Sequence, residues 1–304
     1  MEILETKIPE VAEHVQEDRA MDATNNRTGK MKDYFRNKNV LITGGSSGIG
    51  LALAKQLTEL GATVWILGSN LEKLEKAIQV IDPTSTRIFQ ADVRKLDDIQ
   101  KVFEYLNSNG IKLDILINSA GVVQPGEFEM QEIDLFHWMM DINYFGTLNS
   151  IKTFLPLMDK GSNIVNISSM AAILGIYGYT AYSASKYAVR GFSDAFRSEM
   201  KIKGINVSIV FPPDTQTPQL DYDNRFKPKI TKELSSTAGI MTAENVAKFI
   251  IHGVKDNKYM IIPGMESKFI YWATNFLGNL TYPVMDMLVN SAIKKIKNQE
   301  TKTG

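Results

Sequence analysis

The stretch Val40-Leu-Ile-Thr-Gly-Gly-Ser-Ser-Gly-Ile-Gly50 decides the fold that this sequence predicts. Its first three residues form an apolar run that is typical of a buried parallel strand. The segment 51–60 that follows is apolar at helical spacing and stops at Gly61, a residue that commonly ends helices. A glycine-rich turn between a strand and a helix suits a phosphate, because glycines admit close approach and a helix N-terminus favours negative charge.

The same alternation of short apolar runs and helical patterns continues along the chain. Further strands are expected at 63–67, 87–90, 114–117, 163–167 and 206–211, and helices at 71–81 and 97–106. This pattern indicates right-handed βαβ units and therefore an α/β fold, a Rossmann-type doubly wound parallel sheet. We expect one catalytic domain at 38–264, a polar, flexible N-terminal extension at 1–37 and an apolar, then basic C-terminal tail at 265–304.

Composition excludes several classes of function. The 304 residues include 34 Lys and Arg, 34 Asp and Glu, and no Cys. Zero net charge gives no support for nucleic-acid binding, and the lack of Cys excludes disulfides, thiolate nucleophiles and thiolate metal sites. The histidines (His14, His137 and His252) lack metal-ligand spacing, and the GxSxG elbow of a serine hydrolase is missing. No apolar segment follows Met1, so we expect a cytoplasmic protein without a secretory signal.

The glycine turn has the form TGxxxGxG, and with the motifs that follow it the chain resembles the short-chain dehydrogenase/reductase family over residues 38–262. Ala91-Asp92-Val93 and Asn118-Ser-Ala-Gly121 match motifs of that family that contact the cofactor and brace the sheet. The resemblance implies a nicotinamide dinucleotide held by Gly44, Ser46, Ser47, Gly48, Ile49, Gly50, Ser69, Asn70, Asp92, Val93, Asn118, Ala120, Gly121, Tyr182, Lys186, Pro212, Thr215 and Thr217.

The end of the second strand indicates which dinucleotide is bound. Leu67-Gly-Ser-Asn70 has no acidic side chain that would hold the adenosine ribose hydroxyls and repel a 2′-phosphate. We therefore expect NADP(H) rather than NAD. Ser69 and Asn70 fit equally well as a cap for the helix that starts at Leu71.

Four residues predict the chemistry. Tyr182 and Lys186 are four residues apart, so on a helix they share one face, and the ammonium is expected to lower the pKa of the phenol. In the family resemblance Ser169, rather than its neighbour Ser168, binds the substrate carbonyl. Asn143 matches the fourth member, whose helix is distorted and whose carbonyl holds a water that reaches the lysine. Tyr182 is then the general acid that protonates a ketone reduced by hydride.

The segment Phe211-Pro-Pro-Asp-Thr-Gln-Thr-Pro218 points to the substrate. It resembles one branch of the family, the 3-ketodihydrosphingosine reductases of sphingolipid synthesis, and implies a lipid-like ketone. Thr217 is favoured over Thr215 as the nicotinamide contact, and 214–240 is expected to form a lid. Two alternatives stay open: reduction of a steroid, retinoid or 3-oxoacyl chain, and a non-catalytic NADP-binding sensor.

The tail has two apolar, aromatic segments, 269–278 and 282–289, followed by Lys294, Lys295 and Lys297. Polar residues and Pro283 interrupt them, so two short helices resting on a membrane fit better than a spanning helix. We expect peripheral membrane contact through 265–297, or else a tail that covers the substrate pocket or a subunit interface. The resemblance also implies pairing of two copies into a homo-oligomer.

Overall fold

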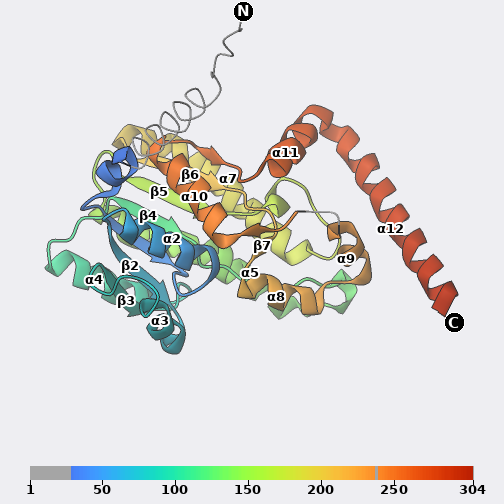
Figure 1. The fold of residues 1–304 in the computed structure, drawn as a ribbon, viewed down its shortest axis with the longest axis horizontal. Helices are drawn as coiled ribbons and strands as arrows, with labels where there is room; N and C mark the ends of the chain where they lie inside the picture. Colours follow the sequence, from blue (N-terminus) through green and yellow to red (C-terminus); the bar gives the residue numbers. More distant parts are fainter. Residues whose placement is uncertain (1–28, 237–238, 304) are drawn as a thin grey trace, which may run out of the picture.

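A seven-stranded parallel sheet lies at the centre of the computed structural model, which describes residues 29–236 and 239–303 (Figure 1). Its order is β3-β2-β1-β4-β5-β6-β9. The strands are β1 (Asn39–Thr43), β2 (Thr63–Gly68), β3 (Thr86–Gln90), β4 (Ile115–Asn118), β5 (Asn163–Ile167), β6 (Asn206–Val210) and β9 (Met260–Ile261). The order reverses between β1 and β4, and this reversal is where doubly wound sheets form their ligand crevice.

Helices cover both faces of the sheet, and further helices form the lid and the tail. They are α2 (Gly48–Glu59), α3 (Leu71–Ile78), α4 (Leu96–Ser108), α5 (Ile133–Met140), α6 (Gly146–Phe154), α7 (Thr180–Lys203), α8 (Pro218–Phe226), α9 (Lys229–Ser235), α10 (Ala243–Lys255), α11 (Met265–Leu277) and α12 (Thr281–Thr303). The shorter elements are the π-helix η2 (Asp141–Phe145), the 3-10 turns η1 (Phe128–Met130), η3 (Leu155–Leu157), η4 (Met170–Ala172) and η5 (Gly278–Leu280), and a second, two-stranded sheet of β7 (Thr215–Gln216) and β8 (Met241–Thr242).

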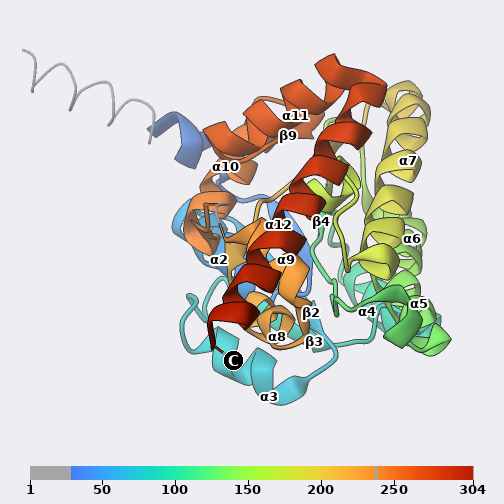
Figure 2. The ribbon, with the colours of Figure 1, turned by 90° about the vertical axis from the view of Figure 1, so that its right-hand side faces the viewer.

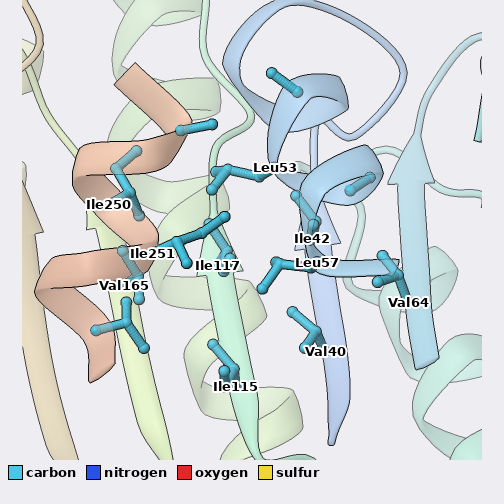
Figure 3. Close-up of a cluster of buried hydrophobic side chains, with 14 of the residues drawn as sticks. Val40, Ile42, Leu53, Leu57, Val64, Ile115, Ile117, Val165, Ile250 and Ile251 are labelled. Carbon is cyan, nitrogen blue, oxygen red and sulfur yellow. The ribbon is translucent and has the colours of Figure 1, made fainter. Parts of the chain in front are cut away.

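Alternate residues of each strand enter two separate cores. In β1, Val40 and Ile42 pack with Leu53 of α2 and Ile250 of α10 on one face (Figure 3). Leu41 points to the opposite face, whose core is built with α4, α6 and α7. Burial on both faces explains why these strands are continuous apolar runs.

The predicted fold is confirmed. The six strands expected from the sequence correspond to β1 to β6, each with ends shifted by at most one residue. The strand β9, whose two residues pair with Ile209 and Val210 of β6, was not predicted from the sequence. Two residues are too few for a periodic pattern, so this edge strand is defined by its pairing alone.

The start of the domain differs from the expected boundary at residue 38. Residues 29–35 form a helix, and its Met31 and Phe35 are buried in the core that α2 and α10 share. The two apolar residues are four positions apart, so they lie on one helix face. Because the residues around Met31 and Phe35 are polar, this short apolar face was not recognised in the sequence. The rest of the predicted extension, 1–28, lies outside the described residues.

The lid and the tail lie together beyond the carboxyl edge of the sheet. The segment expected as a lid contains β7, α8 and α9, and α12 crosses in front of α9 (Figure 2). Two ion pairs join these helices: Lys295 with Glu233 at 2.8 Å and Lys229 with Glu300 at 2.6 Å. The tail forms two helices as expected, but α12 has 23 residues and is longer than its apolar segment. Within residues 29–236 and 239–303, no helix has both the length and the apolarity to cross a bilayer.

Candidate active site

A cavity of about 500 Å³ lies at the carboxyl ends of β1, β4, β5 and β6. One side, the sheet wall, consists of the turns after these strands and the first turns of α7. The other side, the lid-and-tail wall, consists of residues from α8, α9, α11 and α12. Open parallel sheets bind their ligands at this edge, so the cavity is the candidate active site.

The glycine turn after β1 leaves no room for a side chain at Gly44 or Gly50. Gly44 has φ +69°, and a Cβ placed on it would lie 2.8 Å from backbone atoms of Ala120. A Cβ on Gly50 would lie 2.4 Å from the carbonyl oxygen of Gly44. The side chain of Ser47, the N-cap residue of α2, makes no capping hydrogen bond, and Gly48 and Ile49 of the first turn of this helix line the cavity. This turn therefore fits the diphosphate of a dinucleotide.

The structure brings three of the four predicted catalytic side chains to the sheet wall. Tyr182 and Lys186 lie on one face of α7, with the lysine Nζ 5.7 Å from the centre of the phenol ring. Ser169 follows β5 and lines the same cavity. The hydroxyl of Ser168 donates instead to the carbonyl of Lys186 at 3.0 Å, so this serine supports α7.

Lys186 is an almost fully buried cation. Its side chain is 5% exposed, and its Nζ donates to the carbonyl oxygen of Ile167 at 3.0 Å. No carboxylate within the described residues forms an ion pair with it, and burial lowers its pKa to about 8. An ammonium has three N–H groups, so others remain for a ligand in the cavity. Ribose hydroxyls of a dinucleotide fit this position.

The expected lowering of the Tyr182 pKa by Lys186 is wrong for the protein on its own. Burial raises the pKa of the Tyr182 phenol, the nearby Ser169 hydroxyl lowers it, and the charges of Asp223 and Asp214 raise it further. The physical reason is that the phenolate would be formed in a poorly solvated site that already contains carboxylates. At neutral pH the phenol is therefore protonated, which is the form that a general acid needs.

Asn143 lies behind this group rather than in the cavity. Its side-chain amide is buried, accepts from the N–H of Val122 at 2.8 Å and donates to Ser185 of α7 at 2.8 Å. It sits in the π-helix η2, so the local helix distortion that the resemblance implies is present. The backbone carbonyl of Asn143 accepts from the hydroxyl of Thr147 at 2.9 Å. Asn143 thus ties the loop after β4 to the helix that carries the tyrosine.

The predicted cofactor residues divide into two groups. Those that line the cavity are Gly44, Ser46, Ser47, Gly48, Ile49, Ala120, Gly121, Tyr182, Lys186, Pro212, Thr215 and Thr217. Those outside the cavity lining are Gly50, Ser69, Asn70, Asp92, Val93 and Asn118. In the second group, Ser69, Asn70, Asp92 and Val93 follow β2 and β3, Asn118 is the last residue of β4, and Gly50 is buried in the first turn of α2.

Local contacts explain what the outer group does in the protein itself. Asn70 caps α3 by accepting from the N–H of Lys73, and Ser69 is exposed beside it. The carboxylate of Asp92 is held by Arg94 at 2.6 Å, which lowers its pKa. Asn118 is buried and donates to Asn166 of β5 at 2.9 Å, so it braces the sheet.

The loop after β6 packs against the glycine turn at the edge of the cavity. A Cβ on Gly48 would lie 3.0 Å from a methyl carbon of Thr217, so the two segments touch. The hydroxyl of Thr217 accepts from the N–H of Leu220 and begins α8. Thr215 is buried and its hydroxyl donates to the carbonyl of Pro213. Of these two threonines, Thr217 is the one in contact with the glycine turn.

The individual residues of the lid-and-tail wall were not predicted from the sequence. Its apolar members include Leu234, Ile270, Met285 and Leu288. Ile270, Met285 and Leu288 belong to the tail, so α11 and α12 line the cavity. This outcome corresponds to one of the three roles expected for the tail, coverage of the pocket. The signal in the sequence was the apolar character of 269–289, which does not reveal what the residues contact.

Comparison with known proteins gives the same assignment as the geometry. Residues 38–227 match the family model for short chain dehydrogenase. A 3-dehydrosphinganine reductase of Arabidopsis thaliana is 39% identical over 74% of this chain and 69% of its own length. A 3-ketodihydrosphingosine reductase of Mus musculus is 35% identical over 70% of this chain and 67% of its own length.

Solved structures share the fold. A dehydrogenase/reductase from Sinorhizobium meliloti has a TM-score of 0.66 and 26% identity, covering 75% of this chain and 94% of that one. A short chain dehydrogenase from Burkholderia cenocepacia, solved in complex with NADP, has a TM-score of 0.69 and 18% identity, covering 83% and 98%. The chain belongs to the short-chain dehydrogenase/reductase family, and it is an oxidoreductase acting on a ketone or alcohol.

Proposed function

We propose that this enzyme reduces a long-chain keto lipid with NADPH, and that the substrate is 3-ketodihydrosphingosine, which becomes dihydrosphingosine. The observation that carries the proposal is one cavity in which Ser169, Tyr182 and Lys186 face apolar side chains of the lid and tail. A reacting ketone requires the polar groups of the sheet wall, and a hydrocarbon chain requires the apolar side chains of the lid-and-tail wall. The names of the Arabidopsis and mouse relatives support the same substrate.

The proposed chemistry assigns one task to each residue. When bound, the nicotinamide supplies a hydride to the carbonyl carbon. The hydroxyls of Ser169 and Tyr182 donate hydrogen bonds to the carbonyl oxygen and stabilise the negative charge that develops there. Tyr182 then transfers its proton to that oxygen as general acid. Burial supports this role because it keeps the phenol protonated at neutral pH.

Lys186 and Asn143 support the tyrosine. The ammonium of Lys186, held by the carbonyl of Ile167, is placed to bind ribose hydroxyls and to restore the proton of Tyr182. Asn143 holds the loop after β4 against α7 and so fixes the distance between this loop and the helix that carries Tyr182 and Lys186. Its carbonyl, which has a second lone pair beside the bond from Thr147, is the proposed anchor for a water that reaches Lys186.

NADP(H) is the proposed cofactor. Ser69 and Asn70 follow β2 and are both exposed, so their side chains place no negative charge where the adenosine ribose would lie. The N-terminus of α3, which starts at Leu71, adds positive character there. The ratio of kcat/KM with NADPH and NADH tests the choice, and a preference for NADH would overturn it. Ser69→Asp is expected to lower the NADPH efficiency at least tenfold while sparing NADH.

A panel of ketones with NADPH tests the substrate. Oxidation of NADPH is expected with a long-chain 2-amino-3-ketone, and weaker oxidation with a steroid, a retinoid or a 3-oxoacyl ester. Turnover confined to steroids or retinoids would select the first alternative. Binding of NADPH without turnover of any ketone would select the sensor, although a sensor has no use for the tyrosine and lysine pair.

We also propose that the tail rests on the cytoplasmic surface of a membrane. Its outer side, the tail face, is a set of exposed apolar residues: Met265, Phe269, Trp272, Phe276, Leu280, Tyr282, Val284 and Met287. Trp272 and Phe276 stack at 5.2 Å, and other residues of the same two helices line the cavity. A lipid substrate would then enter from the surface that the tail touches.

Flotation with liposomes tests the membrane proposal. The full chain is expected to float, and a Trp272→Ser/Phe276→Ser variant is expected to float much less. Equal, negligible flotation of both proteins would overturn it. Pairing of two copies through helices beside the active site stays a prediction from the family, and sedimentation analysis of the same samples measures it.

A further inference from the structure

Asp223 is a buried carboxylate beside the candidate active site with one oxygen unused. It lies on α8 in the lid, is 4% exposed and belongs to the lining of the cavity. Its Oδ2 accepts from the hydroxyl of Tyr179 at 2.8 Å and pairs with the ammonium of Lys227 at 3.1 Å. Its Oδ1 is buried and has no hydrogen-bond partner among the described residues.

An unpartnered buried carboxylate oxygen is costly, because a charged acceptor has lost water without gaining a donor. Such groups are rare in native proteins, and each one calls for a physical explanation. The neighbours of Asp223 already use its other oxygen, and Lys227 is shared with Asp214 at 3.3 Å. A hydrogen-bond donor that enters with a ligand would give Oδ1 of Asp223 its missing partner.

The charges of Asp223 and the side chains that contact it indicate which kind of hydrogen-bond donor fits beside Oδ1. Asp223 and Asp214 carry two negative charges, and Lys227 carries one positive charge, so the group has a net charge of about −1. Tyr179 adds a neutral hydroxyl. Burial raises the pKa of Asp223, so a cation beside it would stabilise its ionised form. A cationic donor therefore suits this position better than a neutral or anionic group.

The group also lies close to the reacting atoms. The ring of Tyr179 is 5.9 Å from the ring of Tyr182, and the hydroxyl of Tyr179 donates to Asp223. The charges of Asp223 and Asp214 reach Tyr182, since both raise the pKa of its phenol. A cation held by Asp223 would thus belong to the same end of the substrate as the ketone, not to a distant part of the chain.

We propose that Oδ1 of Asp223 binds the ammonium group of the substrate, on the carbon next to the ketone, and so selects amino ketones over simple ketones. This inference rests on the proposed function, because it names the group that recognises the substrate's amine. Tyr179 and Lys227 hold the carboxylate in place through Oδ2. The aliphatic chain then extends along the apolar residues of the lid-and-tail wall.

Two substrates and two variants test the proposal. The substrates are a long-chain 2-amino-3-ketone and the 3-ketone of equal length that lacks the amine. Asp223→Asn preserves size and the hydrogen bond from Tyr179 while removing the charge. Asp221→Asn is the matched control, because Asp221 lies on the same helix and is exposed. The measurement is the ratio of kcat/KM for the two ketones.

The wild type and Asp221→Asn are expected to prefer the amino ketone by at least tenfold, and Asp223→Asn to lose most of that preference. Asp223→Asn with an unchanged ratio, in an enzyme that does prefer the amino ketone, would overturn the role of Asp223 but leave the proposed function intact. A wild type that reduces the simple ketone and rejects the amino ketone would overturn the proposed substrate itself.

A second measurement covers the case in which Asp223→Asn does not fold. Inhibition of the wild-type enzyme by a long-chain 2-aminoalkane and by the 2-alkanol of equal length compares the two groups without any substitution. Inhibition by the amine at a concentration at least tenfold lower supports the inference. Equal inhibition by both compounds overturns it.

Discussion

The two walls of the active-site cavity are built by different means. The sheet wall consists of turns that follow buried parallel strands, and its shape depends on the backbone, since Gly44 admits no Cβ. The lid-and-tail wall consists of side chains from separate helices, and its members Ile270, Met285 and Leu288 follow the last strand in the chain. The difference indicates that the chemistry belongs to the first wall and the choice of substrate to the second.

If the sheet wall holds the chemistry, the largest effect belongs to Tyr182. Tyr182→Phe removes the acid and is expected to lower kcat by about three orders of magnitude. Binding of NADPH, measured by fluorescence, is expected to change little because the ring remains. Tyr187→Phe serves as the control, since Tyr187 is on the same helix and is 41% exposed. Near wild-type turnover of Tyr182→Phe would contradict the assignment.

Lys186→Met is expected to reduce kcat/KM by about two orders of magnitude and to stabilise the fold. The folded protein holds the pKa of Lys186 at about 8, below its ordinary value of 10.5, so the unfolded chain binds that proton more tightly. The burial penalty is then complete below pH 8 and declines as the pH rises towards 10.5. At pH 7 the variant should gain about 3 kcal/mol in free energy of unfolding.

Urea unfolding of the wild type and Lys186→Met at pH 7 and pH 9.5 measures this difference. The advantage of the variant should shrink at the higher pH, because the wild-type lysine is then largely neutral when folded. A variant that is less stable than the wild type at pH 7 would mean that the hydrogen bond to Ile167 outweighs the cost of burial.

The same contrast between the walls explains how much the sequence predicts. Ser169, Tyr182 and Lys186 were predicted from the family resemblance, and helical spacing and the ends of parallel strands explain why such residues reach one cavity. The choice among the roles expected for the tail stayed open, because an apolar helix fits a membrane, a subunit or a pocket equally well before its contacts are known. Asp223 and Lys227 have the spacing of a surface ion pair, and only tertiary packing reveals that both are buried.

A charge placed in the lid-and-tail wall should affect binding of the substrate rather than the chemistry. Met285→Asp puts a carboxylate in the lining of the cavity and is expected to raise the KM for a long-chain ketone about tenfold, with kcat largely retained. Met287→Asp is the matched control, since Met287 is on the same helix, is 69% exposed and lies outside the lining. Equal effects of both changes would show that α12 acts through the tail face instead.

The smallest expected effect concerns the ion pair that joins the tail to the lid. Lys295 and Glu233 are 2.8 Å apart, with the lysine 60% and the glutamate 22% exposed, and such pairs contribute at most about 1 kcal/mol. Lys295→Glu should therefore raise the KM for a long-chain ketone only about twofold, by loosening α12 from α9. The exchanged pair Lys295→Glu/Glu233→Lys should restore the wild-type KM. If it does not, the position of α12 over the cavity depends on apolar contacts such as those of Met285, and the ion pair is incidental.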